Sequence, residues 1–267
     1  MAMRQTRLDE PLLGESLLPF RKWAVIFQPP KEPRQQVRAP RPIRGLLLDA
    51  CNLLYDDSTW RRWLLRLLMR LGLRIEYGPF FHTFDRDYFD AVCCGQRPFN
   101  EALDAFLISA GLSAGQADEI HLALKSYRRH SDASHHPLIG VRATLAQLRS
   151  SGMKLGVLCN CEHSGEAIGK RSVELLGESP WSAVISSFDL RCTMPKAACY
   201  QAALAALQLP AAEVAFVGHD ARELHGAAVQ GLTTIAFNGD RDAQADIHLQ
   251  RFEDLIALTQ SHSSDAA

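Results

Sequence analysis

The sequence has little that would assign it to a membrane, secreted or nucleic-acid-coating class of proteins. No apolar run approaches the roughly 20 residues that a membrane-spanning helix needs, and the amino-terminal end has no uninterrupted apolar stretch of signal-peptide length. An excess of one charge is also missing, because 29 Lys and Arg residues face 30 Asp and Glu residues. We therefore expect a soluble cytoplasmic protein with no membrane span and no nucleic-acid partner.

Cysteine is scarce and irregularly placed, with seven residues in the whole chain. An odd number of scattered cysteines is typical of reduced thiols rather than of a disulfide framework. Cys93 with Cys94, and Cys159 with Cys161, are spaced too closely and are too few for a repeated zinc-binding pattern. We interpret the cysteines as small buried apolar residues.

The composition is otherwise that of an ordinary globular protein, with 47% hydrophobic and 22% charged residues. The length corresponds to about two domains. Residues 1–42 differ from the rest, because prolines interrupt any helix there and arginines dominate between them. The interrupting prolines are Pro29, Pro30, Pro33, Pro40 and Pro42. We expect this segment to be a basic, proline-rich extension.

From residue 43 onward, short apolar runs alternate with stretches of helical length, which is typical of a parallel sheet flanked by helices. The apolar character of each run is nearly continuous, as expected for strands that are covered on both faces. The predicted strands are 45–48, 154–158, 183–186, 214–217 and 233–237. The predicted helices between them are 139–150, 165–176, 197–208 and 222–230.

Residues 57–136 break this alternation and contain only helical patterns. Apolar residues recur with helical spacing from Trp60 to Leu71, while Arg62, Arg66 and Arg70 fall on another face. Two more helices are expected at 99–108 and 117–127, with Ser113 as the cap of the second. The predicted fold is therefore α/β: a three-layer, Rossmann-like parallel sheet with a helical cap inserted after the first strand. Its core comprises 43–56 and 137–262, and its cap 57–136.

Polar residues follow several of the predicted strands at their carboxyl ends, where open parallel sheets bind ligands. Asp49 follows the first strand directly. A carboxylate at that place is a helix cap, a nucleophile or a metal ligand. Because further acidic residues follow another strand of the same sheet, an active or metal-binding site is favoured over a helix cap. The other strand-end residues are Cys51, Asn52, Cys159, Asn160, Ser186, Ser187, His219, Asp220 and Glu223.

Four segments, in order, resemble the motifs of the haloacid dehalogenase superfamily of hydrolases. The segments GLLLDACNLLYD and KLGVLCN are similar to its first and second motifs. The segments TMPKAACYQAAL and VAFVGHDARELHGAAVQGLTTIAF are similar to its third and fourth. The resemblance covers about 43–250, and the helical insert has the size of the family's cap.

The resemblance implies a Rossmann-like core with a mobile lid, and a nucleophilic Asp that forms a covalent aspartyl intermediate, usually with Mg²⁺. Asp49 matches the nucleophile. Cys51 stands where phosphatases of the family have a second, acid–base Asp, and a thiol is a poor substitute because it stays protonated near neutral pH. Asn52 follows in the same loop as a candidate substrate-binding residue.

Other positions depart from the family pattern. Cys159 replaces a phosphate-binding Ser or Thr, so that Asn160 beside it becomes the candidate donor. Met194 replaces the family's Lys and removes a cation that neutralises the nucleophile and the transferring group. Lys196, two residues later, is the candidate replacement.

The metal site implied by the resemblance is altered in one position. His219 replaces the first metal-binding Asp, which makes His219 a candidate substrate-binding residue. Asp49, the backbone carbonyl of Cys51, Asp220 and Glu223 remain as candidate ligands for Mg²⁺.

Three functions are consistent with this pattern. The first is a hydrolase of small phosphate esters that uses Asp49. The second is a catalytically impaired family member that binds a small ligand or a partner, because several functional side chains are replaced. The third is metal-independent haloacid dehalogenation, for which His219 or Lys196 would supply the cation. The sequence is also compatible with a homodimer. Candidate specificity residues in the insert are Trp60, Arg61, Tyr77, Phe80, Phe81 and Arg86.

Overall fold

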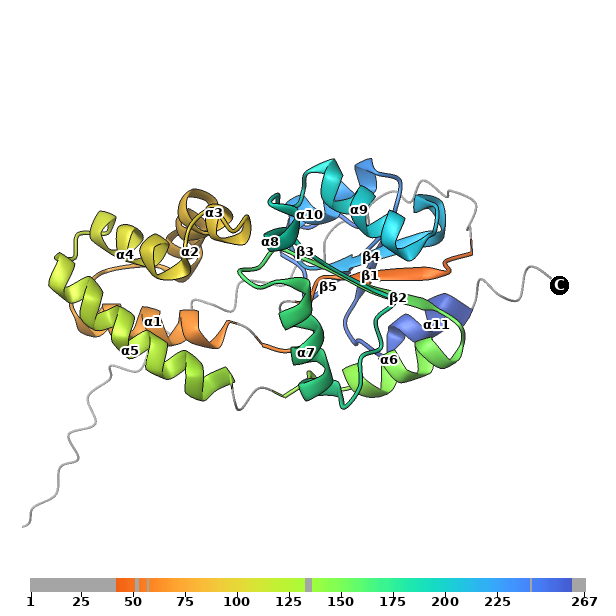
Figure 1. Cartoon of the computed structure of the whole chain (residues 1–267), viewed down its shortest axis with the longest axis horizontal. Coiled ribbons are helices and arrows are strands. Elements are labelled where there is room, and N and C mark those ends of the chain that lie inside the picture. Colours follow the sequence, from red (N-terminus) through yellow and green to blue (C-terminus); the bar gives the residue numbers. More distant parts are fainter. Residues whose placement is uncertain (1–41, 51–52, 57, 133–135, 241, 261–267) are drawn as a thin grey trace, which may run out of the picture. The chain divides into compact units, whose positions relative to one another are not determined.

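A computed structural model describes residues 42–50, 53–56, 58–132, 136–240 and 242–260 (Figure 1). Within these ranges one six-stranded sheet has the order β3-β2-β1-β4-β5-β6. Every pair of neighbouring strands in it is parallel. The predicted Rossmann-like α/β architecture is confirmed. No helix in these ranges has the length and apolar character required to cross a membrane.

The strands lie close to their predicted positions. They are β1 (Gly45–Leu48), β2 (Lys154–Cys159), β3 (Ala183–Ser186), β4 (Val214–Gly218), β5 (Thr233–Phe237) and β6 (Ile247–Leu249). The sequence did not predict β6, because its three residues, with a histidine in the middle, form no apolar run. The outer strand needs less apolar character, since only one neighbour pairs with it.

Helices cover both faces of the sheet (Figure 1). On one face lie α9 (Ala197–Leu207) and α10 (Ala221–Val229). On the other face lie α6 (Val141–Ser150), α7 (Gly165–Leu176) and α11 (Asp254–Gln260). The short helices α8 (Ser187–Leu190) and η3 (Ala211–Glu213) complete this part of the chain.

The central strand β1 contributes side chains to both hydrophobic layers. Leu46 and Leu48 pack in the layer with α6, and Leu47 packs in the layer with α9 and α10. All three are fully buried. Successive side chains of a strand point to opposite faces, so a strand with helices on both sides needs apolar residues at every position. This accounts for the continuous apolar run that predicted β1.

The helical insert, defined here as residues 58–132, lies between β1 and α6 in the chain. It contains α1 (Thr59–Arg70), α2 (Tyr77–Phe84), a π-helical segment η2 (Asp85–Phe89), α3 (Asp90–Cys93), α4 (Phe99–Ser109) and α5 (Ala114–Asp132). The insert has an aromatic-rich core of its own, in which Trp60, Phe81 and Phe84 meet edge to face. Its two ends lie together, because the backbone N–H of Leu138 donates to the carbonyl of Leu54 at 2.9 Å.

Local sequence signals explain two helices of the insert. In α1, Trp60, Leu64 and Leu68 are buried, whereas Arg66 and Arg70 are exposed, as the helical spacing predicted. At the start of α5, the Ser113 hydroxyl accepts from the N–H of Gln116 at 3.3 Å, and the Gln116 side chain accepts from the N–H of Ser113 at 2.9 Å. This reciprocal pair is a capping box, and it confirms Ser113 as the cap.

Candidate active site

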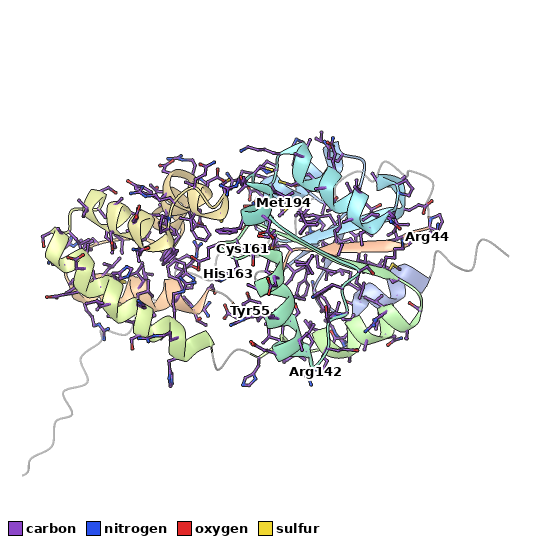
Figure 2. All side chains as sticks on the ribbon, viewed as in Figure 1. Arg44, Tyr55, Arg142, Cys161, His163 and Met194 are labelled. Atoms are coloured by element: carbon purple, nitrogen blue, oxygen red, sulfur yellow. The ribbon has the colours of Figure 1, made fainter. Side chains whose placement is uncertain are left out.

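Asp49 extends from the carboxyl end of the central strand. Its backbone N–H donates to the carbonyl of Val217 at 3.0 Å, which continues the pairing of β1 with β4 by one residue. The residue is 3% exposed. Figure 2 shows Arg44, which precedes β1, at one end of the strands and Met194 and Cys161 at the other end. The backbone position of Asp49 is therefore fixed by the sheet.

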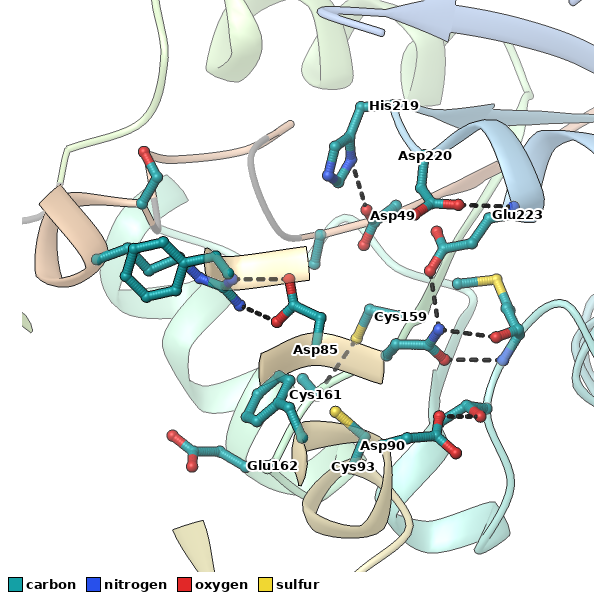
Figure 3. A pocket seen from close by; sticks show the side chains of 18 of the residues that line it. Asp49, Asp85, Asp90, Cys93, Cys159, Cys161, Glu162, His219, Asp220 and Glu223 are labelled. Carbon is teal, nitrogen blue, oxygen red and sulfur yellow. Dashed lines mark hydrogen bonds and ion pairs between the residues drawn. The ribbon is translucent and has the colours of Figure 1, made fainter. Parts of the chain in front are cut away.

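His219 forms an ion pair with Asp49. It follows β4, and its Nδ1 lies 3.0 Å from Oδ2 of Asp49 (Figure 3). Burial lowers the pKa of His219, but the close contact with Asp49 and the charges of Asp49, Glu223 and Asp240 outweigh it and raise this pKa to about 9. The imidazole is therefore a cation at neutral pH. It supplies a positive charge beside the nucleophile candidate, where the sequence has lost a lysine.

Asp220 and Glu223 belong to the first turn of α10. Oδ1 of Asp220 caps the helix by accepting from the backbone N–H groups of Arg222 at 2.8 Å and Glu223 at 3.0 Å. Oε2 of Glu223 is buried without a hydrogen-bond partner in the described part of the chain. Burial and the charges of Asp49 and Asp220 raise the pKa of Glu223 well above its usual range. This strand end thus concentrates negative charge.

Asn160 joins three parts of the site. Its Nδ2 donates to Oε1 of Glu223 at 2.8 Å and to the carbonyl of Met194 at 3.1 Å. Its Oδ1 accepts from the backbone N–H of Met194 at 2.8 Å. The amide therefore holds the loop before α9 against the first turn of α10, and it acts in this structure as a positioning group.

The loop before α9 carries the two residues that stand near the family's lysine. Met194 is buried and packs with Leu47 and Leu158 in the hydrophobic layer beneath α9. Lys196 is exposed at the residue before α9. The two-residue shift therefore moves the amine from the buried position to the rim of the site.

Cys159 and Cys161 supply thiols at the end of β2, at the position of the hydroxyl group expected from the family. Their Sγ atoms lie 3.5 Å apart. The hydrogen bond with Cys159 lowers the pKa of Cys161 despite its burial. Cys161 Sγ also lies 3.7 Å from the hydroxyl of Ser186. A polar hydroxyl is therefore present nearby, although it comes from β3.

A cavity of about 1540 Å³ brings the strand ends together with the insert. Every predicted site residue that the structure describes lines this cavity: Asp49, Cys159, Asn160, Lys196, His219, Asp220 and Glu223. Cys51 and Asn52 were also predicted, and they lie outside the described residues. Of the six specificity candidates, Phe80 does not line the cavity and packs on Phe106 within the insert.

The insert contributes arginines that are held by carboxylates and aromatic rings. Arg61 donates to both carboxylate oxygens of Asp85, at 2.8 Å and 2.7 Å. Its guanidinium carbon lies 5.0 Å from the ring centre of Trp60 and 5.2 Å from that of Phe81. Such stacking and a bidentate ion pair fix the orientation of a guanidinium. Arg61 is therefore an ordered part of the cavity wall.

Polar contacts that the sequence analysis did not predict connect the insert with the core. Arg128 of α5 pairs with Glu162, which follows β2. The hydroxyl of Thr193 donates to Asp90 at 2.6 Å, and the hydroxyl of Ser187 donates to the carbonyl of Cys93 at 2.9 Å. A sequence signal existed for Ser187 and Glu162, which are polar residues just beyond the ends of two strands.

The donor set can be compared with the needs of Mg²⁺, which prefers oxygen ligands in octahedral geometry. No group of three or more His, Cys, Asp or Glu side chains within the described ranges is already arranged around a metal position. The carboxylates of Asp49, Asp220 and Glu223 are nevertheless ligands of the right kind. The unpartnered Oε2 of Glu223 and its raised pKa indicate uncompensated negative charge that a cation would relieve. In their chemistry these residues fit Mg²⁺.

A family model of haloacid dehalogenase-like hydrolases matches residues 43–231. The chain belongs to this family. The match spans β1, the insert and the strands through β4, and it includes Asp49, Asn160, His219, Asp220 and Glu223. Membership confirms the resemblance seen in the four motifs. No curated protein sequence matches the chain significantly.

Solved structures of haloacid dehalogenase-like proteins share the fold. A 2-haloacid dehalogenase from Pseudomonas syringae pv. Tomato is 20% identical, with a TM-score of 0.52, and the match covers 82% of this chain and 99% of that one. The hydrolase YfnB from Bacillus subtilis, bound to magnesium, is 18% identical, with a TM-score of 0.60, and the match covers 82% and 100%. A family hydrolase from Geobacter sulfurreducens is 17% identical, with a TM-score of 0.58, and the match covers 81% and 96%.

Proposed function

We propose that this haloacid dehalogenase-like protein hydrolyses a small phosphate ester, with Asp49 as the nucleophile and His219 as its cationic partner. The observation that supports the proposal most directly is the 3.0 Å ion pair between these two residues at the cavity wall. Met194 has removed the lysine expected in this family, and a protonated histidine beside the nucleophile restores one positive charge.

In the proposed reaction, a carboxylate oxygen of Asp49 attacks phosphorus and the bond to the leaving oxygen breaks. The leaving alkoxide needs a proton, which we assign to the imidazolium of His219. Water then attacks the aspartyl phosphate, releases inorganic phosphate and regenerates Asp49. The proton lost by this water returns to His219. One histidine would thus serve the acid–base role for which Cys51 is poorly suited.

Other side chains would bind and orient the substrate. Lys196, at the rim of the cavity, would attract the phosphate dianion. Asn160 would act indirectly, because both ends of its amide already hold Met194 and Glu223. Its replacement would release the loop before α9 and the first turn of α10 together.

Mg²⁺ would be held by Asp49, Asp220 and Glu223, together with the backbone carbonyl of Cys51. When bound, it would supply positive charge to the phosphoryl oxygens and keep the carboxylates ionised. Asp220 would have to offer Oδ2, because Oδ1 caps α10.

The helical insert would act as the cap of this site, with a core of 43–56 and 137–262 and a cap of 57–136. The cavity is lined from both parts, and the pair of Arg128 with Glu162 connects them. A cap that closes over the strand ends would exclude water and limit the substrate to small molecules.

The test is hydrolysis of a panel of small phosphate esters, with and without Mg²⁺, by the wild type and by Asp49→Asn. Asp118→Asn is the matched control, because Asp118 is exposed on α5. We expect phosphate release by the wild type and the control, and a loss of at least about 10³-fold in Asp49→Asn.

The two other functions predict different results in the same assay. Halide release from 2-chloropropionate without metal, and no phosphate release, would indicate attack on carbon instead. If neither reaction occurs although a metabolite binds, the chain is a binding protein. Either result would overturn the proposed phosphatase function.

A further inference from the structure

Two thiols flank the loop that carries Met194 and Lys196. Cys192 precedes this loop, and Cys199 lies in the first turns of α9. Their Sγ atoms are 3.3 Å apart. Both residues are outside the set that lines the cavity. The pair is therefore separate from the proposed catalytic groups, although it borders the loop that Asn160 holds.

The two thiols differ in access to solvent. Cys192 is half-buried, whereas Cys199 is fully buried. Burial raises the pKa of Cys199 far above the usual value of a thiol. Lys196 lies close enough to oppose this shift. Reactive cysteines are partly exposed, so Cys192 is suited to react first and Cys199 to react second.

We propose that Cys192 and Cys199 form a site of reversible covalent modification, which closes to an intramolecular disulfide on exposure to a low-molecular-weight disulfide. The geometry supports this, because the two sulfur atoms are already in contact, one in the first turn of α9 and the other in the chain that leads into it. Cys159 and Cys161 also touch, at 3.5 Å, but both are buried, and Cys161 Sγ is already engaged by the hydroxyl of Ser186 and the carbonyl of His163.

The chemistry balances with oxidised glutathione as the oxidant. The Cys192 thiolate attacks one sulfur of the oxidant, forms a mixed disulfide and expels one glutathione thiolate. Cys199 then loses its proton and attacks the Cys192 sulfur, which breaks the mixed disulfide and expels the second glutathione thiolate. The protein loses two protons and two electrons, and the oxidant takes them up and becomes two glutathione thiols.

The second step benefits from proximity. A thiol held beside the mixed disulfide reacts as if it were at very high concentration, which compensates for the high pKa of a buried group. The mixed disulfide on Cys192 is therefore short-lived. A long-lived glutathione adduct would mean that the Cys199 sulfur cannot reach it.

Trypsin separates the possible products, because Lys196 lies between the two cysteines. The full-length protein is incubated with oxidised glutathione, its remaining thiols are alkylated, and it is digested without reductant. Cys192 falls in the peptide Cys192–Lys196, and Cys199 falls in Ala197–Arg222. We expect these two peptides to be joined, with a mass two hydrogens below their sum, and to separate on addition of dithiothreitol.

Variants and competing pairings complete the test. Cys192→Ser should remove the cross-link, and this half-buried position limits the damage to folding. Cys94→Ser, which changes a cysteine of the insert, should leave the cross-link unchanged. A stable glutathione adduct on Cys192, a link from Cys192–Lys196 to Asp87–Lys125, or no loss of thiols would each overturn the proposal. None of these results depends on hydrolytic activity.

Discussion

Nδ1 of His219 lies 3.0 Å from Oδ2 of Asp49, so that an ion pair joins the ends of the adjacent strands β1 and β4. The histidine stands where the family places a metal-binding aspartate. The substitution exchanges a negative side chain for a positive one directly beside the nucleophile candidate. The positive charge of His219 therefore offsets part of the negative charge of the carboxylates at this site.

Replacing His219 should weaken catalysis more than binding. In His219→Gln the cation and the proton are lost, while the polarity and approximate size of the side chain are kept. We expect kcat to fall by about 10²-fold or more. The measurement is steady-state kinetics with the best phosphate ester of the panel. His225→Gln is the control, because His225 is exposed on α10. An unchanged kcat in His219→Gln would refute the proposed role.

The stability of the folded protein should decrease as the pH rises through the titration of His219. The pKa of His219 is raised from 6.5 to about 9, so the folded state holds this proton more tightly than the unfolded state. The contribution is complete below pH 6.5 and is lost as the pH approaches 9. It amounts to up to about 3 kcal/mol. Urea denaturation with a metal chelator present, across this pH range, measures it.

His219→Gln is also the control for this pH dependence. The variant lacks the titrating imidazole, so the difference in unfolding free energy between wild type and variant should shrink with rising pH. A difference that stays constant from pH 6.5 to 9 would show that the ion pair does not hold the proton.

Restoring the family's lysine should raise activity and lower stability. Met194 lines the cavity and is buried, so Met194→Lys would place an amine near the nucleophile at the cost of a buried apolar contact. We expect faster Mg²⁺-dependent turnover and a loss of about 1–3 kcal/mol in unfolding free energy. Met194→Gln controls for the lost packing. An equal or lower rate in Met194→Lys would contradict the alignment of the third motif.

A methyl group at Gly226 should disturb the packing behind the site. A Cβ there would lie 2.6 Å from the Tyr200 hydroxyl and 2.7 Å from Cβ of Pro195. The Tyr200 hydroxyl donates to the carbonyl of Glu223 at 2.7 Å, so its displacement reaches the first turn of α10. Gly226→Ala should cost about 1–3 kcal/mol of unfolding free energy in urea. Gly169→Ala, with open space at its Cβ, should gain about 0.5–1 kcal/mol.

The pair of Arg128 with Glu162 should affect substrate binding more than chemistry. Removing one partner weakens the connection of α5 with the core and leaves the other charge unpaired. We expect Arg128→Gln and Glu162→Gln each to raise KM several-fold with little change in kcat. The double variant should resemble either single variant, because both remove the same interaction. Additive effects would show that the two residues act separately.

The core of the fold could be predicted because its strands are buried on both faces. Leu46, Leu47 and Leu48 form an unbroken apolar run for this reason, and the polar residue that ends it is Asp49. Strand β6 escaped prediction because an outer strand imposes no such requirement. The helices from α2 to α3 were not predicted either. Gly78 and Pro79 are typical of turns, but here they lie in the first turn of α2, where proline is tolerated.

The grouping of the strand-end residues around one cavity could be predicted, but their contacts with one another could not. Parallel strands end at one edge, so Asp49, Asn160 and His219 had to lie near each other. Which side chains pair depends on rotamers and loop paths that leave no periodic signal. The contact of His219 with Asp49 could therefore not be predicted. The same holds for the contact of Arg128 with Glu162, which are 34 residues apart in the chain.

The hydrogen bond from Leu138 to Leu54 has a consequence for how such a protein can diversify. It brings the segments that enter and leave the helical insert side by side, so the insert departs from the core and returns to it at one place. A gene segment of another length could replace it without changing the register of β1 against β2 and β4. The nucleophile would keep its position while the wall that selects the substrate changes. A chimaera with a transplanted insert would inherit the chemistry of one parent and the selectivity of the other.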